Sequence, residues 1–230
     1  MTSFRLPEGS AVDIVSRVLR KVKALPRVVS KSVSRGRYDR MVTDALSVTP
    51  GRLLNVGCGS KSYTHIILGD EVRVDLQDAG APDLITDAQA LPFKQETFGI
   101  VLMEHVIHDC SIPHAAIGEA RRVLRPGGSL IMTAPFLFPE ISEHDKFRFT
   151  QHGLTSLLGD FASIQVEPQY EGWGALGVLV ARLETERGLA GLVGVLLLPI
   201  ALLLKTLDPI LNRMIPLRSY GSGFFVTAVK

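Results

Sequence analysis

The stretch Leu53-Leu54-Asn55-Val56-Gly57-Cys58-Gly59 decides the fold of this chain. Its first four residues are mostly apolar and suit a short buried strand, and two glycines follow at once. Because glycine has no Cβ, a turn of this kind lets a ligand approach the backbone closely. A helix that begins after the turn would also present unpaired amide groups to the ligand. The stretch therefore predicts a strand, a ligand-binding glycine turn and a following helix.

Apolar runs and turn signals alternate along the rest of the chain. The sequence predicts further strands at 72–76, 83–85, 98–103, 129–134, 162–166 and 224–229. It predicts helices at 37–48, 112–124 and 151–161, with a turn at 125–128 after the second helix. Such alternation is typical of a doubly wound, Rossmann-like α/β domain with a largely parallel sheet. A chain of 230 residues suits one domain of this class with attachments.

Two aspartates lie at or after the ends of predicted strands, at positions that suit an adenosine ligand. Asp75 lies 18 residues after Gly57, where a carboxylate can bind both ribose hydroxyls. Asp87 follows the third predicted strand and could accept a hydrogen bond from the adenine amino group. Ser62 stands where the dinucleotide fingerprint needs a third glycine, so close approach of a pyrophosphate is not provided for. The pattern therefore disfavours a nicotinamide dehydrogenase.

Five motifs occur in order and carry a family resemblance. They are Leu53–Gly59, Val74–Leu76, Asp87–Phe93, Met103–Val106 and Glu119–Gly128. At these spacings they resemble the class I S-adenosylmethionine-dependent methyltransferases, in their small-molecule branch. The resemblance covers residues 50–165 and the last strand. It implies a seven-stranded sheet with the last strand antiparallel, methyltransferase activity, and S-adenosyl-L-methionine as the cofactor.

The resemblance also implies a set of cofactor-binding residues. Gly57 and Gly59 would line the methionine moiety, and Asp75 would hold the ribose. The full set is Asn55, Gly57, Cys58, Gly59, Asp75, Leu76, Asp87, Ala88, Met103 and Glu104. Asp87 and Ala88 would flank the adenine, while Met103 and Glu104 would lie beside the sulfonium. Asn55 stands where the family usually has an acidic residue, so a non-catalytic cofactor-binding module stays open as an alternative.

The acceptor side is expected after the fourth and fifth strands, since ligands bind beyond the carboxyl ends of parallel strands. The run from His144 to Thr150 resembles a stretch in methyltransferases of the polysaccharide and glycolipid pathways. We expect His144 or Asp145 to act as general base and Arg148 to anchor an anionic or sugar-bearing acceptor. Local structural pairing of His144 and Arg148 is the alternative. The sequence predicts no metal, since neither cysteine sits in a metal-ligand spacing.

The two ends of the chain carry features outside the methyltransferase motifs. Residues 1–40 hold ten basic and three acidic residues, a net charge of +7, which leaves −5 on the rest. We expect residues 1–36 to form a basic arm with an amphipathic helix at 11–25. Residues 37–230 would form the methyltransferase domain, with an apolar helical insertion at 174–217. Within that insertion, Gly188–Leu204 is a run of 17 residues without a charge.

The charge-free run is near the lower limit for spanning a bilayer. A single crossing would separate the last strand from the sheet, so we expect a helical hairpin, or a helix, that dips into one leaflet. Packing against the arm at 11–25, or against a second copy, is the alternative. The expected partner is a small-molecule or lipid-linked acceptor, and the expected place is the cytoplasm, peripheral on the membrane inner face. Nucleic acid is not expected, because the arm has almost no aromatic residues for stacking. The oligomeric state is not set by the sequence.

Overall fold

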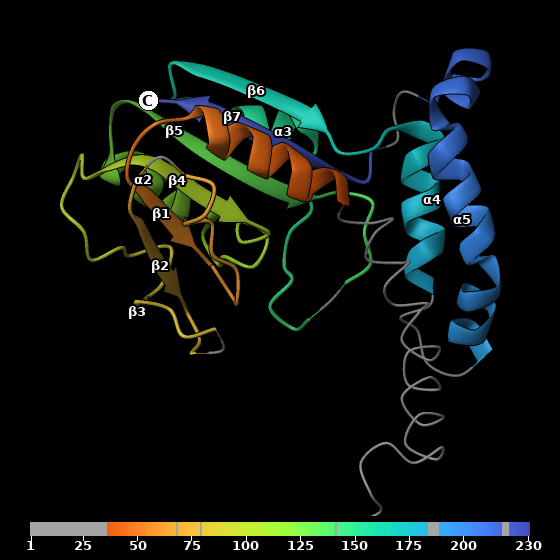
Figure 1. Ribbon diagram of the computed structural model, residues 1–230, viewed down its shortest axis with the longest axis horizontal. Coiled ribbons are helices and arrows are strands. Elements are labelled where there is room, and N and C mark those ends of the chain that lie inside the picture. The colour runs from red at the N-terminus through yellow and green to blue at the C-terminus, as the bar shows by residue number, and fades with distance from the viewer. Residues whose placement is uncertain (1–35, 68, 79, 141, 184–188, 218–220) are drawn as a thin grey trace, which may run out of the picture.

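The computed structural model describes residues 36–67, 69–78, 80–140, 142–183, 189–217 and 221–230. Its centre is a seven-stranded sheet in the order β3-β2-β1-β4-β5-β7-β6 (Figure 1). The strands are β1 Leu53–Val56, β2 Glu71–Asp75, β3 Leu84–Ile85, β4 Phe98–Glu104, β5 Leu124–Pro135, β6 Ser163–Pro168 and β7 Gly223–Val229. β1 to β5 run parallel, and β7 is antiparallel to both β5 and β6. The expected Rossmann-like sheet with an antiparallel last strand is confirmed.

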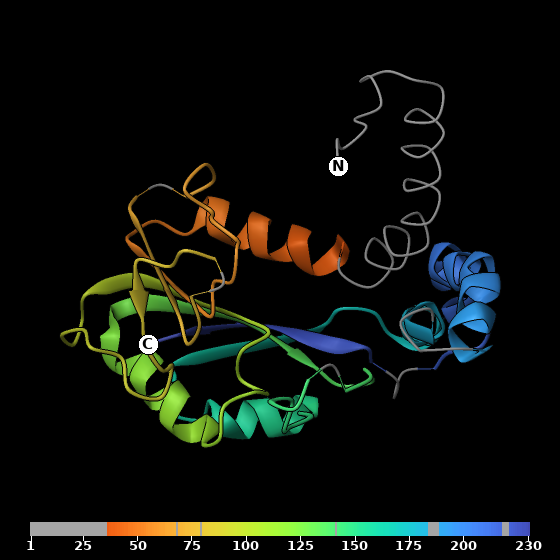
Figure 2. The same cartoon turned by 90° about the horizontal axis from the view of Figure 1, so that it is seen from below.

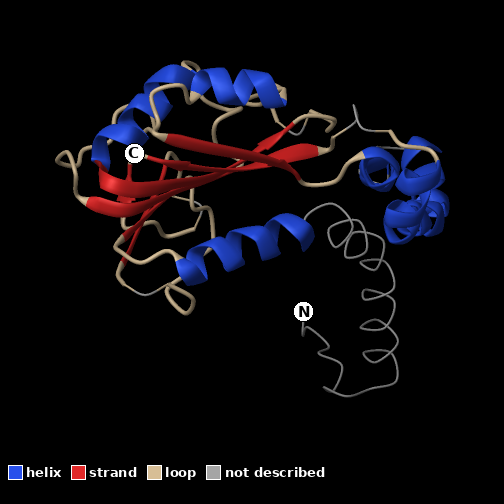
Figure 3. Cartoon of the chain, turned by 90° about the horizontal axis from the view of Figure 1, so that it is seen from above, coloured by secondary structure: helices blue, strands red, loops and turns tan. Residues whose placement is uncertain are grey.

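Helices cover both faces of the sheet (Figures 2 and 3). Helical residues 36–48 lie on one face, where Tyr38, Val42 and Leu46 are buried. The helices α2 (Pro113–Val123) and α3 (Gln151–Leu157) lie on the other face. The arm at 1–36 and the helix at 11–25 fall outside the described residues, apart from Gly36.

The side chains of the central strands point alternately to the two faces of the sheet and form a hydrophobic core on each face. In β4, Ile100 and Leu102 pack in the layer under residues 36–48. Their neighbours Val101 and Met103 pack in the layer under α2 and α3. Because successive side chains of a strand point to opposite faces, an apolar run such as β4 is buried on both sides. This central position fixes the loop after β4, which carries part of the site.

The segment after the glycine turn differs from its prediction. The sequence predicted a helix there, but residues 57–67 form only one helical turn, in which the amides of Ile66 and Ile67 donate to the carbonyl of Tyr63. Side chains of β2 satisfy much of this backbone instead. Arg73 donates to the carbonyls of Gly59 and Lys61, and Glu71 accepts from the amide of Tyr63. These bonds replace the ladder that a helix would make.

The start of β5 also differs from its prediction. The sequence predicted a turn at 125–128, whereas the strand begins at Leu124, which pairs with Phe98. The register then shifts, and Gly127 takes a φ of +73°. Lys230 exchanges backbone hydrogen bonds with Gly127 and Gly128. The glycines therefore form an irregular stretch inside the strand instead of a separate turn.

Two antiparallel helices form a hairpin at one end of the sheet (Figure 1). They are α4 (Gly172–Arg182) and α5 (Leu189–Met214), in the region where the sequence predicted an apolar insertion. The contact between them is built from small residues. A Cβ on Gly177 would lie 2.7 Å from the carbonyl oxygen of Ala201. Small residues of this kind allow two helix backbones to approach closely.

The outer side of α5 carries large apolar side chains. Eight of them are exposed at spacings of three or four residues and form what we call the leucine stripe: Leu189, Leu192, Leu196, Ile200, Leu203, Leu207, Ile210 and Met214. Among the described residues, α5 is the one helix long and apolar enough to cross a membrane, with a mean hydropathy of 2.2 in its 18-residue window. Only 22 % of that window is buried. A helix in the core of a soluble protein normally faces its large apolar side chains inward.

Candidate functional site

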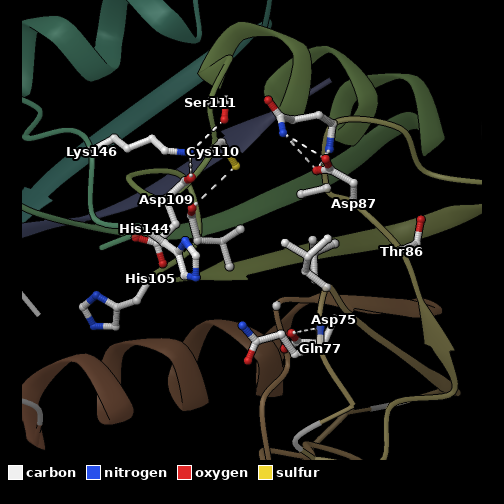
Figure 4. Close-up of a pocket in the computed structure, with 16 residues that line it drawn as sticks. Asp75, Gln77, Thr86, Asp87, His105, Asp109, Cys110, Ser111, His144 and Lys146 are labelled. Atoms are coloured by element: carbon white, nitrogen blue, oxygen red, sulfur yellow. Dashed lines mark hydrogen bonds between the residues drawn. The ribbon is translucent and has the colours of Figure 1, made fainter. Parts of the chain in front are cut away.

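A cleft of about 350 Å³ opens at the carboxyl ends of the parallel strands. Its walls come from the loops after β1, β2, β3, β4 and β5 (Figure 4). This edge is where ligands bind in open α/β sheets, because the strand order reverses there and leaves a crevice. Six of the predicted site residues line the cleft: Gly57, Asp75, Leu76, Asp87, Ala88 and His144.

The glycine turn has the open backbone that its sequence predicted. Gly57 and Gly59 have φ values of +65° and +49°, which favour glycine. A Cβ on Gly57 would clash with Val106, whereas a Cβ on Gly59 would meet nothing within 4 Å. Gly59 therefore leaves free space beside the cleft. This is a cradle into which a ligand can approach the backbone.

Asp75 joins the glycine turn to the cleft. Its Oδ2 accepts the amide of Gly59 at 2.8 Å, and its Oδ1 accepts the amide of Gln77 at 3.0 Å. Leu76, next along the chain, is 65 % exposed and offers an apolar surface inside the same cleft. Asp87 lies across the cleft, where its carboxylate accepts the side-chain amide of Gln89 (Figure 4). A carboxylate on each side and an apolar side chain between them suit a nucleoside.

A second, smaller cleft of about 260 Å³ lies behind the glycine turn. Cys58, Gly59, Asn55 and Glu104 line it, as does Lys61. Lys61 donates to Glu104 at 2.5 Å and to Asp39 at 2.9 Å, and the hydroxyl of Tyr63 donates to Glu104 at 2.7 Å. An ammonium and a carboxylate thus stand side by side at the turn. They complement the opposite charges of an amino-acid zwitterion.

Asn55 forms part of the wall of the smaller cleft, whereas Met103 lies in the core. Asn55 is buried, and its amide donates to Glu71 at 2.9 Å and to the carbonyl of Lys61 at 3.4 Å. It thereby ties the glycine turn to β2. Met103 is fully buried in the core layer under α2, so its side chain supports β4 from within and lines neither cleft.

His105 occupies the end of β4 between the two clefts. It has a φ of +56°, a left-handed conformation that is rare for a residue with a side chain. Its amide donates to the hydroxyl of Thr133, and the ring of Tyr38 lies edge-on at 5.1 Å. Such strained backbone is commonly stored at functional sites. Here it turns the chain so that His105 and Val106 both line the cleft.

The cysteine thiols are poor nucleophiles. Cys58 is buried, and burial raises the pKa of its thiol, although Arg73 partly offsets the effect. Cys110 lines the cleft, and burial together with Asp87 and Asp109 raises its pKa to about 11. Because the thiolate is the reactive form, neither residue is poised for nucleophilic catalysis at neutral pH. The cleft therefore offers oxygen and nitrogen groups for chemistry.

The three residues predicted for the acceptor side separate into two places. His144 lines the cleft near its mouth (Figure 4). Asp145 is almost fully buried and forms an ion pair with Arg148, in which Nη2 donates to Oδ2 at 2.8 Å. Arg148 also donates to the carbonyls of Phe138 and Pro139. In this arrangement Asp145 and Arg148 hold the loop after β5 in shape, while His144 faces the ligand space.

A buried histidine and an aspartate lie next to His105. His108 is buried, and burial lowers its pKa although Asp109 and Asp145 act against the shift. Its Nε2 lies 3.5 Å from Oδ1 of Asp109, an oxygen that has no hydrogen bond within the described part of the chain. Asp109 lines the cleft, where Lys146 donates to its carbonyl (Figure 4).

His108, Asp109 and Asp145 bring ligand-type atoms within 4.8 Å of one another. The guanidinium of Arg148 binds both carboxylate oxygens of Asp145. Arg148 therefore already supplies, at Asp145, the positive charge that a bound metal ion would bring to these three residues.

Several cleft residues carried no signal in the sequence. Lys61 and Tyr63 follow the glycine turn at positions expected to be helical, and nothing in their spacing indicated a meeting with Glu104. Gln89 and Lys146 reach the cleft through loops whose course depends on tertiary packing. They could be found only once those loops were placed. The residues that do line the two clefts fit S-adenosylmethionine: carboxylates for the nucleoside and a charged pair for the amino-acid end.

Comparison with known proteins agrees with this geometry. Residues 54–132 match the family model described as a methyltransferase domain. A ubiquinone/menaquinone biosynthesis C-methyltransferase of Ruegeria is 32 % identical over 146 residues, covering 54 % of this chain and 58 % of that protein. A demethylmenaquinone methyltransferase of Renibacterium salmoninarum is 33 % identical over 117 residues, covering 45 % and 49 %. The chain thus spans about half the length of these curated relatives.

A solved structure shares the fold across nearly the whole chain. It is an S-adenosylmethionine-dependent methyltransferase of Thermotoga maritima described as a possible histamine N-methyltransferase. It is 16 % identical, has a TM-score of 0.56, and covers 92 % of this chain and 97 % of its own. The sheet order, the glycine turn with Asp75 and Asp87, and the family match together show that the chain contains a class I S-adenosylmethionine-dependent methyltransferase domain.

Proposed function

We propose that this protein transfers the methyl group of S-adenosylmethionine to a small, lipid-linked acceptor at a membrane surface. The observation that carries the proposal is the union of two features in one chain. One is the nucleoside cleft at the strand ends, and the other is a hairpin whose leucine stripe faces outward. The first suits the cofactor, and the second suits a bilayer.

The chain's own residues would hold the cofactor by its polar ends. Asp75 would accept hydrogen bonds from the ribose, and Asp87 from the adenine amino group. Lys61 and Glu104 would face the carboxylate and ammonium of the amino-acid end. The cofactor supplies a methyl carbon that is activated by the positive sulfur. The main task left to the protein is to position an acceptor against that carbon.

Proton removal would fall to a group that lines the cleft. His144 is the base favoured by the sequence, and its side chain faces the ligand space. Asp109 is a second group of the right kind, because the residue lines the cleft and its side chain is partly exposed, although its Oδ1 is buried beside His108. Either one can take a proton from an acceptor hydroxyl during transfer.

Two kinds of lipid-linked acceptor are in view. The names of the curated relatives point to quinone acceptors. The run from His144 to Thr150 points instead to sugar-containing acceptors. Both kinds can be carried on a lipid tail, which would keep them at the bilayer where the hairpin binds. We place the protein on the cytoplasmic face of the membrane, held there peripherally.

The proposal is tested by methyl transfer into lipid fractions. Purified protein is incubated with S-adenosylmethionine labelled in the methyl group and with a total lipid extract. The extract is separated into an apolar fraction that contains quinols and a polar fraction that contains glycolipids. We expect label in one organic fraction for the wild type and much less label for Asp75→Asn when the cofactor concentration is kept below saturation. Label found only in water-soluble products would contradict the lipid-linked acceptor. Cofactor binding without transfer to any fraction would favour the non-catalytic module.

A further inference from the structure

A basic cleft of about 500 Å³ lies between helical residues 36–48 and α5, away from both cofactor clefts. Three cations line it: Arg37, Arg40 and Lys205. The remaining walls are Met41, Asp44, Tyr170, Asp208 and Pro209. Tyr170 belongs to the connection between β6 and α4, so the cleft sits where the hairpin joins the sheet.

The cations converge on one aromatic ring. Arg37 and Lys205 lie 5.7 Å and 5.4 Å from the centroid of Tyr170. Burial and the nearby charge of Arg40 both lower the pKa of Lys205. Like charges held together in a partly buried place repel one another, and a bound anion relieves that repulsion.

The two carboxylates of the cleft offset part of this charge. Asp208 accepts the amide of Gly174 at 2.6 Å and the side-chain amide of Asn212 at 2.8 Å. Those bonds direct its carboxylate toward the start of α4. Three cations and two carboxylates leave the cleft with a net charge of +1.

The hydroxyl of Tyr170 is the second observation that points to a ligand. Tyr170 is 6 % exposed, and its hydroxyl has no hydrogen-bond partner within the described part of the chain. A buried hydroxyl left without a partner is costly, and most such groups are satisfied. An oxygen of a bound ligand would accept this hydroxyl hydrogen while the surrounding cations neutralise its charge.

We propose that this cleft binds the phosphate group of an anionic phospholipid headgroup. The choice of a lipid over a soluble phosphate rests on the proposed membrane contact and on the position of Lys205. Lys205 follows directly after the charge-free run of α5, and the leucine stripe runs past it on the same helix. With the stripe in the acyl region, the flank of α5 would lie at headgroup depth.

The test compares binding of the full chain to vesicles of phosphatidylcholine alone and to vesicles that also contain phosphatidylglycerol. The decisive variant is Tyr170→Phe, because it removes the hydroxyl and keeps both the ring and every charge. We expect Tyr170→Phe to weaken binding to the anionic vesicles by about tenfold, the effect of one hydrogen bond to a charged group. Binding to the neutral vesicles stays unchanged.

A charge series separates the cleft from general attraction to an anionic surface. Arg40→Gln and Lys205→Gln each remove one positive charge from the cleft, and Arg213→Gln removes one from α5 outside it. A cation that is merely near the surface contributes about fivefold. We expect both cleft variants to lose clearly more affinity for anionic vesicles than Arg213→Gln. The eight basic residues before Gly36 contribute to every variant alike.

The outcomes distinguish the site from the membrane contact. If Tyr170→Phe binds both vesicles like the wild type, the headgroup site is wrong and the membrane contact stands. If the wild type binds no vesicle, the membrane contact itself is wrong. Inorganic phosphate is titrated as the soluble probe. If Tyr170→Phe weakens phosphate binding but leaves vesicle binding unchanged, the cleft takes free phosphate, and the lipid assignment is overturned.

Discussion

Asp75 contacts both the glycine turn and the cleft, and its substitution can be compared with that of an aspartate outside the site. Its carboxylate shapes the glycine turn through Gly59 and faces the cleft where the ribose would lie. We expect Asp75→Asn to weaken S-adenosylmethionine binding by about tenfold to a hundredfold, since hydrogen bonds to a charged group are lost. Calorimetric titration measures this. Asp70→Asn, an exposed aspartate just before β2, serves as the control and should bind like the wild type.

His108 should make the fold sensitive to acid. Burial lowers the pKa of His108 below 6.5 in the folded protein, so the unfolded chain takes up a proton more readily. The free energy of unfolding is therefore expected to fall as the pH drops below about 6.5, by up to about 1.4 kcal/mol per pH unit. The fall stops once the pH lies below the folded pKa. Above 6.5 the residue is neutral in both states and has no effect.

Urea unfolding at a series of pH values between 7.5 and 5 checks the acid sensitivity. His108→Asn should reduce the slope of stability against pH. His152→Asn changes an exposed histidine on α3 and should keep the wild-type slope. Equal slopes in His108→Asn and the wild type would show that His108 does not cause the acid sensitivity of the fold.

The sequence was enough to predict those site residues whose position depends only on their spacing from a strand. Gly57, Gly59, Asp75 and Asp87 all lie at the end of a strand or within three residues after it, so the strand pattern fixed their place at the sheet edge. Lys61 meets Glu104 across 43 positions of sequence, and the parallel pairing of β1 with β4 brings their segments together. The sequence did not indicate that Asp145 is buried, because this residue and its partner Arg148 lie in a loop without a periodic pattern.

The contact between α4 and α5 depends on glycine at position 177. A Cβ there would lie 2.7 Å from a backbone oxygen, so Gly177→Ala must push the helices apart. We expect it to destabilise the hairpin by about 1–3 kcal/mol, which is typical of overpacking. Hydrogen exchange of the α4 and α5 amides measures the change.

Gly118 in α2 provides the matched control for this substitution. A Cβ there would meet nothing within 4 Å. Gly118→Ala should therefore stabilise α2 by about 0.5–1 kcal/mol through helix propensity alone. Loss of protection in both variants, or in neither, would contradict the close packing of the hairpin.

Strands were easier to predict than the segments between them. The apolar runs at 53–56 and 98–103 need burial on both faces, so their place in the sheet centre follows from composition. The glycines at 127 and 128 suggested a turn, yet the terminal Lys230 pairs with them and extends β5. A pairing with the far end of the chain leaves no mark on the local sequence.

The leucine stripe should decide whether the whole protein binds membranes. Leu196→Gln together with Leu203→Gln places two amides in the middle of the stripe. We expect vesicle binding to fall by at least about a hundredfold, since each of the two leucines contributes about 1.5–3 kcal/mol when fully inserted. Cofactor affinity should not change. Val48→Gln is the control. Val48 is 77 % exposed and ends the helical residues 36–48, outside the leucine stripe, so this variant should leave vesicle binding intact.

At the level of the whole chain, the sequence predicted an apolar hairpin or helix, but not where its helices end or which side chains face outward. The charge-free run ends at Leu204, while α5 continues to Met214 with Lys205 and Asp208 inside it. Asp208 is accommodated because it accepts the amide of Gly174, and that bond exists only once α4 packs alongside. The outward direction of the large side chains also depends on this packing, so only the structure could show it.

The close packing of α4 on α5 has a consequence for how the protein would move in a cell. A helix pair that is already assembled in water loses little backbone freedom on docking, so association costs little ordering. A hairpin that rests in one leaflet also has no polar domain to drag through the bilayer. The protein would therefore exchange between bilayers as an intact unit, and a wash with alkali should release it from membranes without detergent.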